Sequence, residues 1–424
     1  MYDAEVKTKK KKKPRGKRIL KGIGIFFLVI VLLIALVAGG VTVTNAVTVK
    51  SERNFAKSLA PVAYTAQLEP SLDDNGFYTF VTDGDFKVMQ LTDIHIGAGF
   101  MSNKVDTMAL NAVAAMITAE QPDLVCVSGD IAFPIPYQAG TINNKTAATI
   151  FADMMEQLGV YWAPVFGNHD TESFSYYSRE EIGELYESDK YPHCLFQAGD
   201  PDVHGVGNYV INVKTTAGEI TQSIFMIDSN DYVDTSLAST INWVYDCIHE
   251  DQIEWYEKTL YALAEDNGGN IPKSIAFFHI PLAEMKDAWT EYCSNNFEDT
   301  ENVQYVYGKA GESEAVIYCS NLNNGFFDKV LELGSTQGIF NGHDHLNNFS
   351  LYYKGVRMTY GYSIDYLAYK GISTIGSQRG CTIITLHPDG SFDCTPENYY
   401  QDKYQGVNAK ESVTMQEQEN HIPE

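Results

Sequence analysis

The chain has 424 residues, of which 44% are hydrophobic and 12% aromatic, and it carries a formal net charge of -25. This length and composition fit a packed globular protein with one large α/β domain or two smaller ones. The charge is uneven, because the first 21 residues hold ten Lys or Arg and leave 20 basic against 53 acidic side chains for the remainder. Phosphate contacts to nucleic acid need a basic face, so no nucleic-acid partner is expected.

The N-terminal region predicts a membrane anchor. Residues 1–21 form a basic segment, and Gly22 to Val43 are almost wholly apolar, which is long enough for one bilayer crossing. The positive-inside rule places the basic segment in the cytoplasm, so the rest of the chain is expected outside, in a single-pass membrane protein. The alternative is a cleaved signal peptide, since small residues occur near Gly39; the length of the apolar run favours an uncleaved signal-anchor.

Residues 44–85 predict a stalk that ends in an opening strand, and residues 86–407 predict the folded domain. Strand-like and helical patterns alternate at its start, which indicates parallel β-α-β units. Polar residues following such strands gather at one edge of the sheet, where ligands bind in α/β proteins. The expected strands are Phe86–Thr92, Asp123–Val127 and Val160–Phe166, with helices over Val105–Glu120 and Lys145–Leu158 between them.

The second half of the chain has a weaker pattern. Further strands are expected at Tyr209–Val213, Ser223–Asp228 and Ser274–Phe278. Residues 285–325 are rich in Asn, Glu, Tyr and Gly, and we interpret them as an inserted loop over the cleft. Phe349 to Leu386 predicts a terminal β-meander, and the polar tail at 408–424 is expected to be disordered.

Polar residues with metal-ligand chemistry follow five of the apolar runs. Hard carboxylate and amide oxygens together with imidazoles are the ligands that a pair of divalent ions needs, and a shared carboxylate can bridge the two ions. Taken alone, each residue has an ordinary structural alternative, such as a capping Asp or a buried core His. The candidates are Asp93, His95 and His345 for one ion, Asn168, His279 and His343 for the other, and Asp130 between them.

His169 and Asp170 follow Asn168 directly and are left without a metal role. A histidine beside such a site suits a general acid that protonates the leaving alkoxide of a phosphate ester. Asp170 is then expected to orient His169 or raise its pKa. These two residues are the predicted catalytic pair.

The five motifs in this order resemble the calcineurin-like metallophosphoesterase superfamily, and two stretches, Phe277–Leu282 and Gly342–Phe349, resemble its purple-acid-phosphatase-related subgroup. The resemblance implies a four-layer α/β/β/α sandwich, two bridged divalent metals, and hydrolysis of a phosphate ester by a metal-bound hydroxide. The metal roles assigned above agree with the family pattern at each position. One departure is Phe133, which stands where purple members have a Tyr on ferric iron, so Mn, Zn or non-chromophoric Fe is expected.

The sequence therefore predicts an exported, membrane-anchored, metal-dependent phosphoesterase. A nucleotidase or phosphodiesterase of the same superfamily is one alternative, although only 79 residues follow His345, too few for a separate substrate domain. A catalytically inactive, metal-stabilised surface module is the other alternative. The retained pair of His169 and Asp170 argues against it.

Overall fold

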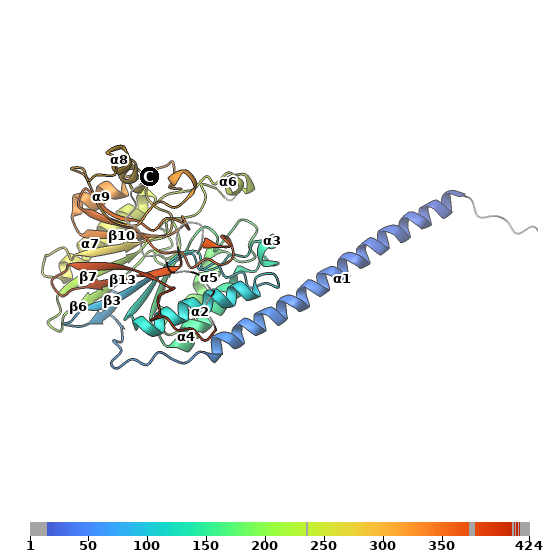
Figure 1. Ribbon diagram of the computed structural model, residues 1–424, viewed down its shortest axis with the longest axis horizontal. Coiled ribbons are helices and arrows are strands. Elements are labelled where there is room, and N and C mark those ends of the chain that lie inside the picture. Colours follow the sequence, from blue (N-terminus) through green and yellow to red (C-terminus); the bar gives the residue numbers. More distant parts are fainter. Residues whose placement is uncertain are drawn as a thin grey trace, which may run out of the picture.

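The computed structural model describes residues 15–234, 236–372 and 378–408, together with 411, 413 and 415. Two β-sheets pack face to face, and helices cover their outer faces (Figure 1). The five-stranded sheet has the order β14(Phe392–Asn398), β13(Gly380–Leu386), β3(Phe86–Leu91), β4(Leu124–Ser128), β5(Trp162–Val165). The nine-stranded sheet has the order β1(Ser71–Leu72), β2(Tyr78–Val81), β6(Tyr209–Lys214), β7(Ile220–Met226), β8(Ser274–Phe277), β10(Thr336–Asn341), β12(Val356–Tyr360), β11(Ser350–Tyr353), β9(Val303–Tyr307).

The helices lie in two groups. The outer face of the five-stranded sheet carries α2(Asn103–Glu120), α4(Asn144–Leu158), α5(Arg179–Tyr186) and the end of α1(Arg15–Ser58). The nine-stranded sheet is covered by α7(Glu250–Asp266), α8(Ala283–Ser294) and α9(Phe326–Leu333). Two short helices, α3(Pro136–Ala139) and α6(Leu237–Ile241), and the 3-10 turn η1(Ser313–Ala315) lie in connecting segments.

Alternating side chains explain why the nine-stranded sheet is buried on both faces. Ile275 and Phe277 of β8 point into the core shared with the five-stranded sheet, whereas Ala276 points into the core under α7, α8 and α9. A strand with two apolar faces needs cover on both sides, because successive side chains point in opposite directions. The predicted four-layer α/β/β/α sandwich is confirmed.

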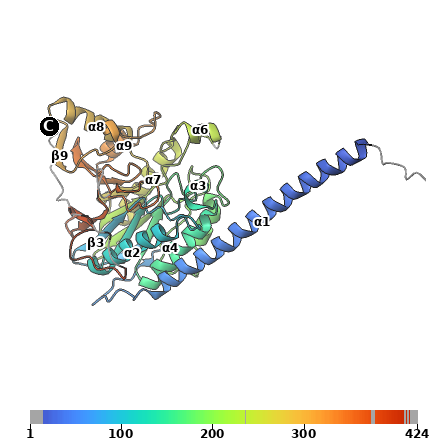
Figure 2. The same ribbon diagram turned by 45° about the vertical axis from the view of Figure 1, so that its right-hand side comes forward.

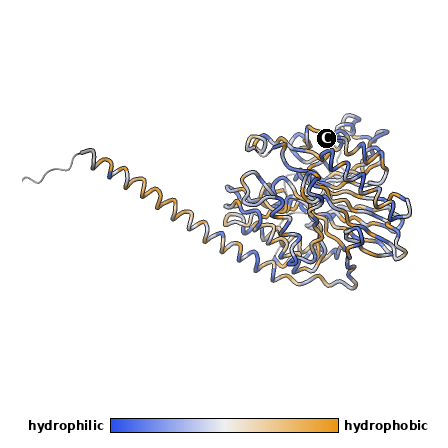
Figure 3. The backbone as a smooth tube through the Cα atoms, turned by 180° about the vertical axis from the view of Figure 1, so that it is seen from behind, coloured by the Kyte–Doolittle hydropathy of each residue, from blue (hydrophilic) through white to orange (hydrophobic). Residues whose placement is uncertain are grey.

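The anchor helix differs from the expected stalk. α1 runs without a break from Arg15 to Ser58, and Thr48, Glu52 and Ala56 on its last turns are buried against the domain. The stretch beginning at Ile19 is long and apolar enough to cross a membrane. Figure 3 shows its apolar part standing clear of the domain. The first third of the predicted stalk is therefore helix packed on α2 and α4.

Two further expectations about secondary structure are wrong. Residues 285–325 are not one loop, because they contain most of α8 and the edge strand β9, which pairs with β11. The predicted terminal meander is divided between the sheets: β11 and β12 join the nine-stranded sheet, whereas β13 joins the five-stranded one. Residues 1–14 of the basic segment, and most of the tail at 408–424, lie outside the described residues.

Candidate metal centre and active site

The ends of five parallel strands bring the candidate residues to one edge of the sandwich. Asp93 and His95 follow β3, and Asp130 follows β4. The three residues from Asn168 to Asp170 follow β5, also in the five-stranded sheet. The nine-stranded sheet contributes His279 after β8, and His343 and His345 after β10. The site therefore lies where the carboxyl ends of strands from both sheets meet.

A single oxygen atom of Asp130 lies between histidines from the two sheets. Its Oδ2 atom is 3.3 Å from Nε2 of His95 and 3.1 Å from Nε2 of His279. Asp130 is fully buried, and its Oδ1 atom accepts a hydrogen bond of 2.8 Å from the backbone N–H of His169. This arrangement is what a carboxylate shared by two ions requires.

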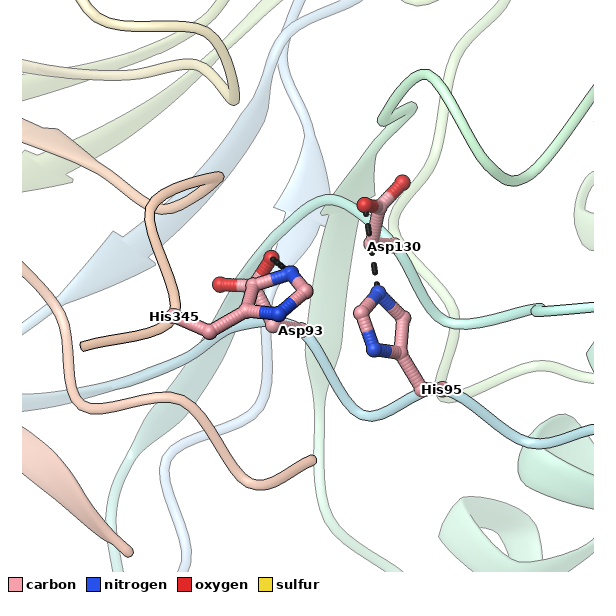
Figure 4. A group of neighbouring side chains, drawn as sticks. All are labelled: Asp93, His95, Asp130 and His345. Atoms are coloured by element: carbon pink, nitrogen blue, oxygen red, sulfur yellow. Dashed lines mark hydrogen bonds and ion pairs between the residues drawn. The ribbon is translucent and has the colours of Figure 1, made fainter. Parts of the chain in front are cut away.

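One group of side chains surrounds the His95 side of Asp130. Ligand atoms of Asp93, His95, Asp130 and His345 all lie within 4.8 Å of one another (Figure 4). Nε2 of His345 lies 3.5 Å from Oδ1 of Asp93. All four residues are buried, which makes this a compact Asp-His-Asp-His cluster with the donors that divalent ions take.

A second group surrounds the His279 side. Nε2 of His279 lies 3.2 Å from Oδ1 of Asn168 and 3.3 Å from Nδ1 of His343. The other ring nitrogen of His279 lies 2.9 Å from the backbone carbonyl of Ser128. Together with Asp130, these side chains present one amide oxygen, two imidazoles and one carboxylate to a common centre. The structure thus brings all seven predicted ligands into two adjoining groups.

The backbone at the strand ends adopts a conformation that L-residues rarely take. Asp93, His95, Asp130 and His343 have φ values of 50°, 55°, 55° and 81°. Left-handed backbone at non-glycine residues clusters at functional sites, because the surrounding fold has to maintain it. Space is also tight: a Cβ atom on Gly167 would lie 2.1 Å from Oδ1 of Asp130.

The histidines divide into charged and neutral ones. Burial opposes the charge on each ring, but at His95 the contacts with Asp365 and Asp130 together overcome it and raise the pKa to about 10. Neighbouring aspartates likewise overcome burial at His279 and raise its pKa to about 9. At His345 burial and the charge of His95 lower the pKa to about 3, and burial with His279 lowers the pKa of His343 well below its usual value. Divalent ions would displace the two bound protons, as metal binding to imidazole does.

The donor set fits a dinuclear metal centre. Hard oxygens and imidazoles converge from five strand-end segments, and one carboxylate oxygen lies between the two groups. The sequence profile of the calcineurin-like phosphoesterase family matches residues 86–308. The chain belongs to this family. His343 and His345, which follow β10, lie beyond the matched range.

Relatives of this chain include plant and fungal proteins. "Probable inactive purple acid phosphatase 29" of Arabidopsis thaliana is 27% identical over 339 residues, which cover 73% of this chain and 78% of that protein. "Phosphatase DCR2" of Saccharomyces cerevisiae is 27% identical over 288 residues, covering 63% and 45%. A solved dimetal phosphatase from Danio rerio aligns over 75% of this chain and 98% of its own, with 13% identity and a TM-score of 0.47.

Glu172, which the sequence analysis did not single out, holds the predicted catalytic histidine. Nδ1 of His169 lies 2.6 Å from Oε1 of Glu172, and both side chains line the cleft. Asp170 does not orient the ring as expected. Its carboxylate instead accepts hydrogen bonds from the backbone N–H groups of Asp130, Gly167 and residue 132, at 3.0, 2.8 and 2.7 Å. Asp170 therefore fixes the loops after β4 and β5, and Glu172 orients His169.

Asp365 is a second residue that the sequence analysis missed. It follows β12, and its two carboxylate oxygens lie 3.2 Å from Nδ1 of His95 and 3.5 Å from Nδ1 of His345. A carboxylate behind a metal-binding histidine fixes the ring orientation and the tautomer. Asp365 lies in no histidine motif, and its partners His95 and His345 precede it by 270 and 20 positions in the chain. The sequence therefore carries no local signal for this role.

The site opens into a cleft of about 610 Å³. Of the candidate site residues, His169, His343 and His345 line it. Its walls are mostly aromatic and come from α3, the segment around α6, and the part of the chain between β9 and α9. The aromatic lining residues are Phe133, Tyr137, Phe174, Tyr232, Trp243, Tyr245, Tyr318 and Tyr369.

Proposed function

We propose that this family member is an active, membrane-anchored hydrolase of phosphate esters that uses two divalent ions. The observation that carries the proposal is the position of Asp130, whose Oδ2 atom is within 3.3 Å of histidines from both groups. Asp93, His95 and His345 would hold one ion, Asn168, His279 and His343 the other, and Asp130 both. When bound, ions of this kind (Mn, Zn or Fe) polarise the phosphate and lower the pKa of water.

The protein's own side chains supply the proton and the positioning. Glu172 holds Nδ1 of His169 and thereby fixes the ring, so that Nε2 is the atom that gives its proton to the leaving oxygen of the ester. Tyr232 accepts a hydrogen bond from Nδ2 of Asn168 at 3.2 Å, which turns the amide oxygen toward His279. The aromatic walls exclude bulk water from the ester.

Metal analysis of the full-length protein in detergent tests the centre. We expect two divalent ions per chain, no visible charge-transfer band, and loss of both ions in Asp130→Ala. Asp202→Ala, an exposed aspartate outside the site, is the matched control and should keep both. A single ion in the wild-type protein, or two ions in Asp130→Ala, would contradict the shared role.

Substrate dependence tests His169. General acid catalysis contributes about a hundredfold to ten-thousandfold, so His169→Ala should lose that much turnover on an alkyl phosphate and far less on a nitrophenyl ester, whose leaving group needs no proton. Glu172→Gln should produce the same pattern with a smaller loss. An inactive, metal-stabilised module would bind both ions and hydrolyse neither ester, which is the competing result.

A further inference from the structure

The anchor helix leaves the domain where its apolar stretch ends. Residues 22–43 are apolar and mostly exposed, whereas Thr48, Glu52 and Ala56 are buried against the domain. The helix is continuous through this transition. The same helix therefore connects the apolar stretch to the domain, with no flexible linker between them.

Asn45 ties two loops of the domain to this point. Its Nδ2 atom donates to the carbonyl of Gly140 at 3.1 Å, and its Oδ1 atom accepts from the N–H of Phe100 at 2.8 Å. Asn45 comes two residues after Val43, which is about 3 Å along a helix. Gly140, which caps helix α3, and Phe100 are therefore held beside the end of the apolar stretch.

Large apolar side chains are exposed on this side of the domain. We call them the rim: Phe100, Met101, Tyr137, Ile241 and Trp243, which are between 42% and 77% exposed. Figures 1 and 2 both show α3 and α6 on the side from which α1 leaves. Tyr and Trp are enriched at membrane interfaces, where an apolar ring and a polar tip are both satisfied. The rim thus has the composition and the position of a membrane-contacting surface.

Part of the rim also lines the cleft. Tyr137, Ile241 and Trp243 both belong to the rim and line the cleft. None of the described residues that line the cleft is Lys or Arg, and Glu172 and Glu312 are among them. A polyanionic substrate such as a nucleotide would find no counter-charge on these walls, whereas an apolar group would be well accommodated.

We propose that the substrate is a phosphate ester carried by a membrane lipid and taken directly from the bilayer surface. The rim contacts the bilayer, the lipid enters between α3 and α6, and its phosphate reaches the base of the cleft. Hydrolysis consumes one water: the water oxygen bonds to phosphorus and gives up one proton to solvent, the ester P–O bond breaks, the leaving oxygen receives a proton from His169, and His169 regains a proton from solvent. This substrate class rests on the proposed function and on the membrane anchor.

Vesicle assays of the full-length protein test the proposal. The protein is reconstituted in dioleoylphosphatidylcholine vesicles with dioleoylphosphatidate added, and release of inorganic phosphate, phosphocholine and choline is measured. We expect hydrolysis of one of the two lipids to be faster than that of its water-soluble short-chain counterpart. The double variant Phe100→Ser with Met101→Glu changes the rim outside the cleft. It should lower lipid turnover on the order of tenfold, the effect of losing a buried large apolar side chain.

Hydrolysis of p-nitrophenyl phosphate separates the possible outcomes. The double variant should retain it, which also shows that the variant folds, and Leu72→Glu, an equally exposed apolar residue on β1, should retain both activities. Equal lipid turnover in the double variant and the wild-type protein, or no preference for lipid over short-chain esters, would overturn the lipid proposal. Failure of the wild-type protein to hydrolyse any of these esters would overturn the proposed function instead.

Discussion

Glu52 is a buried carboxyl group on the face of the anchor helix that packs against the domain. Burial, and then the negative charge of Asp106, raise its pKa from 4.5 to about 10. Asp106 accepts hydrogen bonds from the N–H groups of Gly97 and Ala98 and from the hydroxyl of Ser102, at 2.9, 2.9 and 2.7 Å. These contacts hold the Asp106 carboxylate, in the first turn of α2, opposite Glu52.

The raised pKa makes docking of the helix dependent on pH. At neutral pH Glu52 is protonated when folded and ionised when unfolded, so the unfolded state binds fewer protons and stability falls as pH rises. The full stability is present below pH 4.5, and about 1.4 kcal/mol is lost per pH unit above it until the folded pKa is reached. Glu52→Gln keeps the size and removes the titration, so it should raise the free energy of unfolding by about 3 kcal/mol at pH 7.

Denaturant titrations of the full chain in detergent between pH 4.5 and 8 measure this difference. The wild-type protein and Glu52→Gln should have equal stability near pH 4.5 and diverge steadily as the pH rises. Glu184→Gln, on the exposed side of α5, should follow the wild-type curve at every pH. A difference that does not change with pH, or a Gln variant that is less stable at pH 7, would refute the reasoning.

Three further outcomes follow from the site and the anchor. Asp365→Asn should weaken metal affinity about 10- to 100-fold in a chelator competition, because it removes the carboxylate behind His95 and His345; unchanged affinity would exclude that role. Gly167→Ala should lower both metal content and thermal stability, since the new Cβ atom would lie 2.1 Å from Oδ1 of Asp130. A protease added to intact cells should digest the domain and leave a short N-terminal stub; a protected domain would reverse the proposed orientation.

The family, the sandwich and the position of the site could be predicted because they depend on local patterns. Apolar runs of strand length mark buried strands, and polar residues directly after them have to lie at a sheet edge. Asp93, Asp130 and His279 each follow such a run, and the fold brings them to one centre. Their roles as ligands stay predictions until metal content is measured.

The helical continuation of the anchor was harder to recognise. Thr48, Glu52 and Ala56 are four residues apart and share the buried face, which is a helical spacing. Two of the three are polar, however, so the face does not stand out as an apolar stripe. β9 was missed for a related reason: it is a short edge strand whose middle residues are partly exposed, so neither face has a clear apolar pattern.

Four histidines of the site share one arrangement that no motif could reveal. In each, Nδ1 faces a carboxylate or a carbonyl outside the centre: His95 and His345 face Asp365, His169 faces Glu172, and His279 faces Ser128. For His95, His279 and His345 the structure also shows Nε2 directed at Asp130 or Asp93. These partners come from distant parts of the chain, so only the assembled fold creates them. The contacts at Nδ1 fix each ring before any ion binds, so the Nε2 atoms already point toward the centre. Ion binding therefore costs little side-chain conformational entropy.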